Sequence, residues 1–407
     1  MIRLYFFGMT KIIIYLTFFI CYSAVNSANS APVFDKKQLT DQSAVIVTRD
    51  NGEIIHAWNT RKSLIPASVV KIATSLAAIE RFGLDHQFKT DFFIVDDGLW
   101  VKGYGDPYLT SEELDVIAEE LVIRLADQLE KIRFIGIDDS YFPPLKVPGR
   151  SISTQPYDAP LSAVSANFNT LKIRKKGTTI VSAEPQTPIT PLAKSLALSK
   201  RLNNGVHRIN LIKTENSSRY FAELLFAKLK RYGFSNRVST KTGIVPNQAK
   251  LVYQHINSHT LEDALRATLF FSNNFIANQV FLQMNDDQVS TSFEQAANYV
   301  GHLLSLELTR QDNDLARIVE GSGLSRENRL TAEQVVALLK RFEPYKYLMK
   351  TYLGGKVFAK SGTLKGVHNL AGYIQKSNQT YYFAFIFNES VAYGYREKLL
   401  KRLYATL

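Results

Sequence analysis

The sequence contains a single cysteine, Cys21, among 407 residues. One cysteine excludes an intramolecular disulfide framework and any zinc or iron–sulfur site built from cysteines. No internal repeat of 20–50 residues is visible, which argues against solenoid and propeller folds. Hydrophobic residues make up 45% of the chain and charged residues 21%, values that exclude global disorder. The length predicts two to three domains.

The N-terminal segment has the pattern of an export signal. Arg3 and Lys11 precede an apolar run over 12–21, and small residues follow over 23–30. The run is shorter than the about 20 residues that a membrane-spanning helix needs, so a retained anchor is the weaker alternative. We expect residues 1–30 to be a signal peptide and the chain to be exported to the periplasm or cell-wall space. The mature protein would then lack cysteine, because Cys21 lies inside the signal.

The charge balance is basic, with 49 Lys+Arg against 37 Asp+Glu and a net charge of +12. Loss of Arg3 and Lys11 with the signal would leave +10. This balance suits an anionic polymer or an anionic membrane surface. Export argues against nucleic acid as a partner, and we interpret the basic stretch Lys172–Lys176 as a solvated strand edge. The sequence leaves the oligomeric state open.

The two ends of the chain show the pattern of an α/β core. Strands are predicted at 44–48 and 53–58 around the turn at Asp50–Gly52, followed by a helix from Pro66 to about Arg81. Helical periodicity returns over 260–304, and Thr331–Gln334 is a capping box that begins a helix. Alternating strands at 369–374 and 381–387 precede a final basic helix from about residue 392.

The middle of the chain differs from both ends. Short alternating stretches and many prolines over 143–191 indicate β structure with irregular loops, with helical patterns near 111–130 and 218–232. We therefore predict a discontinuous core of residues 31–87 and 251–407, interrupted by a mostly β inserted region over 88–250.

The first chemical motif is Ser68–Lys71, a Ser-x-x-Lys string at the predicted start of a helix. Residues three apart on a helix share a face, so the Lys71 amine can reach the Ser68 hydroxyl. A serine needs a base to become a nucleophile, and a lysine can serve when burial and nearby cations lower its pKa. Backbone N–H groups at the helix N-terminus can stabilise an oxyanion. Taken alone, the string is better explained by a capping serine beside a solvated lysine.

A second motif, Lys360–Thr363, reads Lys-Ser-Gly-Thr and precedes a predicted strand. Lys360 can bind a substrate carboxylate, Gly362 lets a backbone approach closely, and the N–H of Thr363 can complete an oxyanion hole. A similar string at Lys241–Gly243 is interpreted as a surface turn.

A third motif, Ser272–Asn274, lies between the apolar stretches 264–271 and 275–282. A polar triplet at such a junction is either a helix cap or a set of side chains directed into a cleft. In the second case Ser272 can relay a proton to a leaving amine, and Asn274 can contact both substrate and Lys71.

In this order the three strings form the motif set of penicillin-binding proteins and class A β-lactamases. The chain resembles the class C low-molecular-mass penicillin-binding proteins, a D-alanyl-D-alanine carboxypeptidase/endopeptidase family. The similarity extends over about residues 40–400 and rests on five segments: Pro66–Lys71, Lys102–Thr110, Tyr157–Ala163, Glu320–Arg326 and Lys360–Gly372. Ser361 departs from the usual threonine, Glu320 from aspartate, Tyr104 from glycine, and Asn273 stands where aspartate is common.

The resemblance implies an α/β (α+β) transpeptidase-like, or serine β-lactamase-like, domain with inserted domains. It implies cleavage of D-Ala-D-Ala and of D-alanyl cross-links in peptidoglycan stem peptides, with β-lactam antibiotics as covalent inhibitors and no cofactor. Ser68 would be the nucleophile and Lys71 its base, Ser272 and Asn274 would assist, and Lys360, Ser361, Gly362 and Thr363 would bind substrate. Two alternatives remain: a β-lactamase-like hydrolase, and a catalytically silent cell-wall-binding protein.

A metal site was weighed on His255 and His259, four residues apart with Glu262 nearby. The pattern lacks the His-Glu-x-x-His order, and the intervening Asn257-Ser258 is typical of a loop. We therefore predict surface histidines and no metal.

Overall fold

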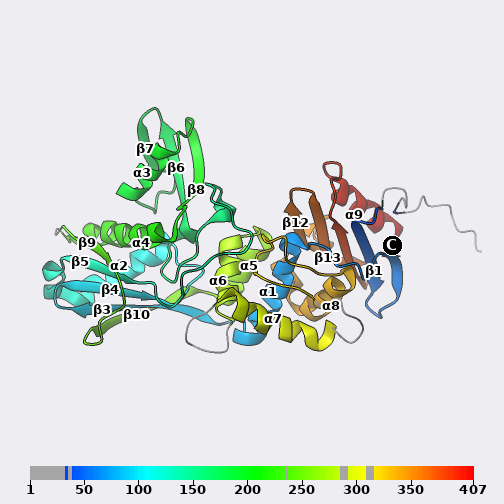
Figure 1. Cartoon of the computed structure of the whole chain (residues 1–407), viewed down its shortest axis with the longest axis horizontal. Helices are drawn as coiled ribbons and strands as arrows, with labels where there is room; N and C mark the ends of the chain where they lie inside the picture. The colour runs from blue at the N-terminus through cyan, green and yellow to red at the C-terminus, as the bar shows by residue number, and fades with distance from the viewer. Residues whose placement is uncertain (1–32, 35–38, 235–236, 285–291, 309–315) are drawn as a thin grey trace, which may run out of the picture.

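The computed structural model describes residues 33–34, 39–234, 237–284, 292–308 and 316–407. The predicted signal peptide over 1–30, with Cys21, lies outside these residues. Within the described part, none of the helices is long and apolar enough to cross a membrane. Figure 1 shows two bodies side by side, with the C-terminus in the right-hand one.

The right-hand body is built on a six-stranded antiparallel sheet in the order β11-β12-β13-β14-β1-β2. Its strands come from both ends of the chain: β1 (Ser43–Arg49), β2 (Ile54–Trp58), β11 (Lys350–Tyr352), β12 (Val357–Leu364), β13 (Val367–Lys376) and β14 (Gln379–Phe387). Ser43 on β1 pairs with Phe387 on β14, so the first and last strands are neighbours in the centre of the sheet. The predicted core from sequence-distant halves therefore exists as one sheet.

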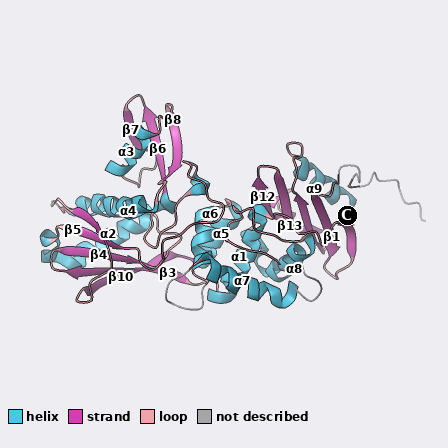
Figure 2. Ribbon diagram, in the orientation of Figure 1, coloured by secondary structure: helices cyan, strands magenta, loops and turns pink. Residues whose placement is uncertain are grey.

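Helices cover both faces of this sheet (Figure 2). On one face α9 (Tyr395–Thr406) buries Leu399, Leu400 and Leu403. The other face packs on a helical layer of α1 (Lys71–Phe82), α5 (Leu261–Phe270), α6 (Asn274–Leu282), α7 (Phe293–Leu308) and α8 (Ala332–Phe342). The predicted capping box is present at the start of α8, where Thr331 and Gln334 satisfy each other's backbone N–H groups.

The left-hand body is an insertion between α1 and α5, and its main sheet has five strands in the order β10-β3-β4-β5-β9. These strands are β3 (Gln87–Val95), β4 (Gly98–Gly103), β5 (Phe134–Asp138), β9 (Ser239–Thr242) and β10 (Lys250–Thr260). Helices α2 (Ser111–Leu125) and α4 (Thr214–Leu229) share a hydrophobic core with it. Since β10 pairs with β3, the inserted sheet continues ten residues beyond the expected boundary at 250.

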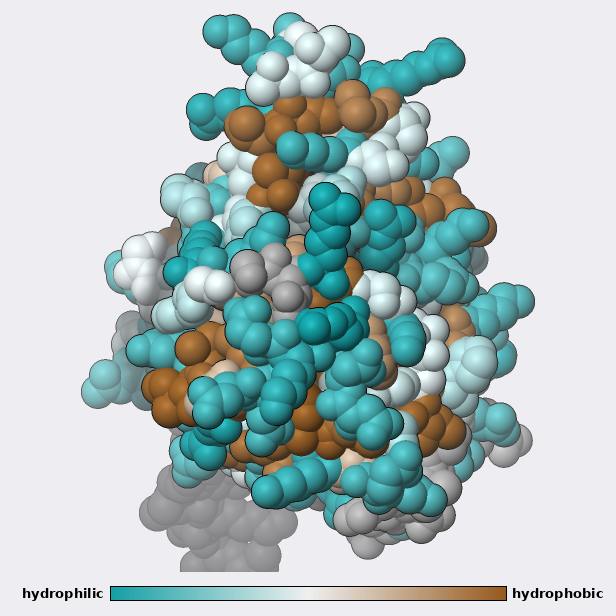
Figure 3. Space-filling view, turned by 90° about the vertical axis from the view of Figure 1, so that its left-hand side faces the viewer, coloured by the Kyte–Doolittle hydropathy of each residue, from teal (hydrophilic) through white to brown (hydrophobic). Residues whose placement is uncertain are grey.

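A smaller sheet projects from the insertion at the top of Figure 1. It contains β6 (Thr170–Lys176), β7 (Thr179–Ser182) and β8 (Gly205–Asn210), packed with α3 (Pro191–Ser199). The insertion thus combines two sheets with three α-helices. Seen from the left-hand side of Figure 1, the surface is largely hydrophilic with scattered hydrophobic patches (Figure 3).

Two local predictions in the insertion are wrong. The basic stretch Lys172–Lys176 is not a strand edge, because β6 is the central strand of its sheet, between β7 and β8. The string at Lys241–Gly243 is not a turn, since its first two residues lie in the edge strand β9, although all of it is exposed as predicted. Both errors arise because strand order depends on distant pairing partners.

Candidate active site

Ser68 and Lys71 lie at the N-terminal end of α1. Ser68 is in a 3-10 turn, Ala67–Val70, and Lys71 is the first residue of α1, so the expected helical start is divided into two helix types. The Lys71 Nζ lies 3.1 Å from Ser68 Oγ. This distance is within the range for proton transfer between a nucleophile and its base.

Lys71 is completely buried and is surrounded by acceptors. Its amine contacts Asn274 Oδ1 at 2.7 Å and also the backbone oxygen of Ser322. Burial lowers the pKa of Lys71 well below its usual value, the charge of Lys360 lowers it further, and Glu320 opposes them. The neutral amine is therefore favoured, and a neutral amine is the form that can accept a proton.

The triplet at Ser272–Asn274 forms the break between α5 and α6, as its polar sequence suggested. Asn273 is the N-cap of α6 and its side-chain oxygen accepts the Ile276 N–H. Its neighbours are free to point elsewhere: Asn274 reaches Lys71, and Ser272 accepts a hydrogen bond from Lys360 Nζ at 2.9 Å. Ser272 has a left-handed φ of 60°, a strained conformation that is common where function fixes the backbone. Both predicted roles of the triplet, cap and cleft, thus occur together.

Lys360, Ser361, Gly362 and Thr363 precede the predicted strand, which is β13, and they themselves lie within a further strand, β12, that was not predicted. Lys360 is 1% exposed, and burial with the charges of Arg396 and Lys350 lowers its pKa to about 7. β11 pairs with β12 only as far as Ala359, so it does not pair with the motif residues on that edge. The 3-10 turn that carries Ser68 packs beside β12, and a Cβ at Gly362 would lie 2.7 Å from the Pro66 oxygen. Glycine is therefore required there.

Three features of the site were not predicted as functional. Glu320 is fully buried, and its carboxylate accepts hydrogen bonds from the N–H groups of Ser322, Gly323 and Ser325 at 2.7–3.1 Å. This fixes the loop whose Ser322 oxygen contacts Lys71. Gly323 has a φ of 81° and lies against the Ala67 carbonyl, where a Cβ would be 2.0 Å from that oxygen. The sequence signal that could have identified this loop is the string Glu-Gly-Ser-Gly from Glu320, an acid followed by small residues.

Arg396 and Tyr157 are the other two features. Arg396 on α9 donates to the Gly362 oxygen at 3.3 Å and to Thr363 Oγ1 at 3.0 Å. The Tyr157 carbonyl of the insertion accepts a hydrogen bond of 3.2 Å from Asn274 Nδ2. No sequence signal marked Arg396, whereas Tyr157 lies in one of the segments that carried the resemblance.

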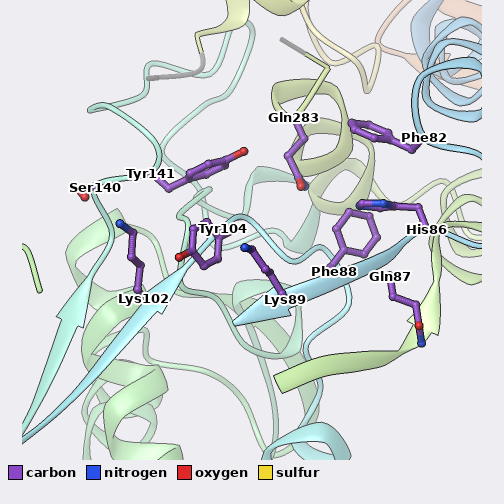
Figure 4. Close-up of a pocket in the computed structure, with 10 residues that line it drawn as sticks. All are labelled: Phe82, His86, Gln87, Phe88, Lys89, Lys102, Tyr104, Ser140, Tyr141 and Gln283. Atoms are coloured by element: carbon purple, nitrogen blue, oxygen red, sulfur yellow. The ribbon is translucent and has the colours of Figure 1, made fainter. Parts of the chain in front are cut away.

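The cleft beside these residues is not the largest cavity in the described part. A cavity of about 370 Å³ is lined by Ser272, Asn273 and Asn274 together with Tyr157 and Arg208 of the insertion. A larger cavity of about 570 Å³ lies at the opposite ends of α1 and α6, around Phe82 and Gln283 (Figure 4). Chemistry, not size, identifies the first as the candidate active site.

The predicted surface histidines need one correction. His255 is only 2% exposed and lies in β10, where its Nε2 is 2.8 Å from the Glu113 carboxylate. Asn257 and Ser258 belong to the same strand, and Ser258 contacts Glu113 too. The loop prediction was wrong because two carboxylates far away in sequence satisfy these polar groups, Glu113 for His255 and Ser258 and Asp106 for Asn257. Among the described residues, no group of His, Cys, Asp and Glu is arranged to hold a metal ion.

The chain matches the D-Ala-D-Ala carboxypeptidase 3 (S13) family over residues 27–201, 201–346 and 340–403. It therefore belongs to that family.

Curated relatives carry the corresponding names. A D-alanyl-D-alanine carboxypeptidase of an Actinomadura strain is 25% identical over 413 residues, covering 81% of this chain and 74% of the relative. The D-alanyl-D-alanine carboxypeptidase DacB of Haemophilus influenzae is 24% identical over 395 residues and covers 80% of each chain.

Solved structures show the same fold. Penicillin binding protein 4 of Haemophilus influenzae superposes with a TM-score of 0.69 at 20% identity, over 91% of this chain and 97% of that one. Another structure of that protein is a complex with a β-lactam. A predatory peptidoglycan endopeptidase of Bdellovibrio bacteriovorus has a TM-score of 0.50 at 15% identity, over 89% and 91%.

Proposed function

We propose that this protein is a serine-type D-Ala-D-Ala carboxypeptidase and DD-endopeptidase that acts on peptidoglycan stem peptides through an acyl-serine intermediate. The observation that carries the proposal is the buried Lys71 amine, placed between the Ser68 hydroxyl and the Asn274 amide oxygen. Burial disfavours the charged form of a lysine, and the neutral amine can then act as a general base.

In the first step Ser68 Oγ attacks the carbonyl carbon of the penultimate D-Ala, and its proton passes to Lys71. The N–H groups of Ser68 and Thr363 are our proposed donors to the oxyanion. As the C–N bond breaks, Ser272 and the protonated Lys71 return a proton to the leaving amine. Water then cleaves the ester, and Ser68 recovers its proton.

Substrate placement follows from the β12 edge. An extended stem peptide can lie along the Lys360–Leu364 edge that β11 leaves unpaired, with its terminal carboxylate at Lys360. Ser361 and Gly362 present backbone there, and Asn274 can bind the peptide from the opposite side. A cross-linked stem needs the same contacts, with a longer leaving group directed toward the cleft.

Covalent labelling with a fluorescent penicillin tests the nucleophile. We expect stoichiometric labelling of the wild-type protein, a mass increase on the Ser68 peptide, and none in Ser68→Ala. Ser75→Ala on the same helix is the matched control and should still be labelled. Labelling that persists in Ser68→Ala contradicts the assignment.

The reaction itself is tested with purified muropeptides and product identification by mass. Release of D-alanine from pentapeptide stems and cleavage of D-alanyl cross-links, both absent in Ser68→Ala, are expected. Rapid release of hydrolysed penicillin without muropeptide cleavage would favour a β-lactamase-like hydrolase. Binding of sacculi without either reaction would favour a silent cell-wall-binding protein.

We also propose export to the periplasm or cell-wall space, because the substrate is found there. The predicted signal over 1–30 supports this placement. Loss of the N-terminal segment from the protein recovered in the periplasmic fraction is the expected result.

A further inference from the structure

The cavity of about 570 Å³ in Figure 4 lies between the two bodies, away from Ser68. Helices α1 and α6 both begin in the active site, at Lys71 and Asn274, and both end at this cavity, at Phe82 and beside Gln283. Twelve residues of α1 at 1.5 Å per residue separate the two places by roughly 17 Å. The remaining walls come from β3, β4 and the Ser140–Tyr141 segment of the insertion.

Two lysines supply the charge of this cavity. Lys89 on β3 and Lys102 on β4 have their amines 4.6 Å and 5.7 Å from the centre of the Tyr104 ring. The adjacent carboxylate, Asp91, is already bound by the Tyr104 hydroxyl and by Gln254, each at 2.8 Å. In the part of the chain that the structure describes, neither lysine forms an ion pair. Asp91 stands opposite Lys102 in the strand register, so the group holds two cations and one carboxylate. Its remaining positive charge attracts an anion.

The other half of the cavity is aromatic. Phe82 stacks on His86 at 4.9 Å, and His86 meets the edge of Phe88 at 5.0 Å. Burial lowers the pKa of His86, so its ring is neutral at pH 7. In Figure 4 these rings lie on one side of Lys89, while Lys102 and Tyr141 lie on the other. Such rings pack against sugar faces and flat amide groups.

We propose that this cavity is a second, non-catalytic binding site for a carboxylate-bearing muramyl peptide of peptidoglycan. The lysines bind the stem carboxylates and the rings contact the sugar or peptide planes. The volume suits a ligand of this size. The proposal rests on the proposed function, because a polymer with repeated stems can occupy the cavity and the active site of one molecule together, which raises its effective concentration at Ser68.

The test is calorimetric titration of the full-length mature protein, acylated at Ser68 with benzylpenicillin, with a soluble muramyl tripeptide. This probe lacks D-Ala-D-Ala and the acylated active site is blocked, so binding at the active site is prevented and the lysine variants locate the binding that is left. We expect saturable binding that weakens with salt. Binding should weaken at least tenfold in Lys89→Gln/Lys102→Gln and further in Lys89→Glu/Lys102→Glu.

The matched control is Lys398→Gln/Lys401→Gln, which removes the same charge from exposed positions on α9. It should bind as the wild type does, and equal melting temperatures show that all variants fold. No saturable binding to the wild type, or equal weakening in the control, overturns the proposal. Equal affinity for a glycerol phosphate oligomer of the same charge also overturns it, because the site would then select charge alone.

Failure of this inference differs from failure of the proposed function. If D-alanine is released from pentapeptide but the tripeptide does not bind, only the second site is refuted. If D-alanine is not released and penicillin does not acylate Ser68, the titration is repeated on Ser68→Ala, and lysine-dependent binding there supports the cavity without the enzyme activity.

Discussion

Two places in this molecule carry nearly the same short sequence, Lys241-Thr-Gly in the insertion and Lys360-Ser-Gly in the core, and only one lies in a site. Lys241 is exposed on the edge strand β9, and its amine lies 3.6 Å from the centre of the Phe134 ring. Lys360 is buried and donates to Ser272. The comparison teaches that the chemistry of such a string depends on burial and on what lies opposite it.

Charge removal at the two lysines is the largest expected contrast. Lys360→Ala should slow acylation by penicillin about 100-fold or more, since a buried charge that binds the substrate carboxylate is lost. Lys241→Ala should acylate at the wild-type rate. Stopped-flow rates of fluorescent penicillin binding measure both. Equal effects of the two changes would show that burial and surroundings do not distinguish Lys360 from Lys241.

The second contrast concerns the loop at Glu320–Ser325, which only the Lys360 string in the core has nearby. Glu320→Gln keeps the shape but replaces a carboxylate that accepts several buried N–H bonds, so we expect about 1–3 kcal/mol of lost stability and roughly tenfold slower acylation. Chemical denaturation and the acylation rate measure the two effects. Glu53→Gln, an exposed acid in the same body, is the control. A stability loss with unchanged acylation would show that the loop does not position Lys71.

The smallest contrast is in pH dependence. Acylation needs neutral Lys71 and charged Lys360, so the rate should fall at high pH as Lys360 loses its proton with a pKa of about 7. The positive charge of Arg396 lowers that pKa, so Arg396→Gln should raise it and move the alkaline limb to higher pH. A pH profile of the acylation rate constant measures the limb. An unchanged limb would mean that another group controls it.

The sequence was sufficient where the chemistry is local. Ser68 and Lys71 are three residues apart, so their spacing indicated that the two side chains can meet. Asn273 caps the helix that Asn274 begins, and a cap was one of the two roles that the polar triplet suggested. The alternation of strands at both ends likewise predicted a core sheet.

Long-range partners account for the parts that could not be predicted. His255 was predicted to be exposed because Glu113, which buries it, is 142 residues away. Lys172–Lys176 was placed at an edge because nothing local reveals that β8 lies on the side of β6 away from β7. Arg396 and the Ser322 oxygen reach the site only through tertiary packing.

The pairing of Ser43 with Phe387 also sets an order of folding. The insertion is continuous in the chain and can form its sheets as soon as it has been synthesised or translocated. The core sheet cannot form until its last strands have been synthesised, because β1 has no neighbour on its β14 side before then. Ser68 is therefore synthesised before Asn274, Ser322 and Lys360 exist beside it, and under the proposed function the serine would stay inactive until the whole chain has folded.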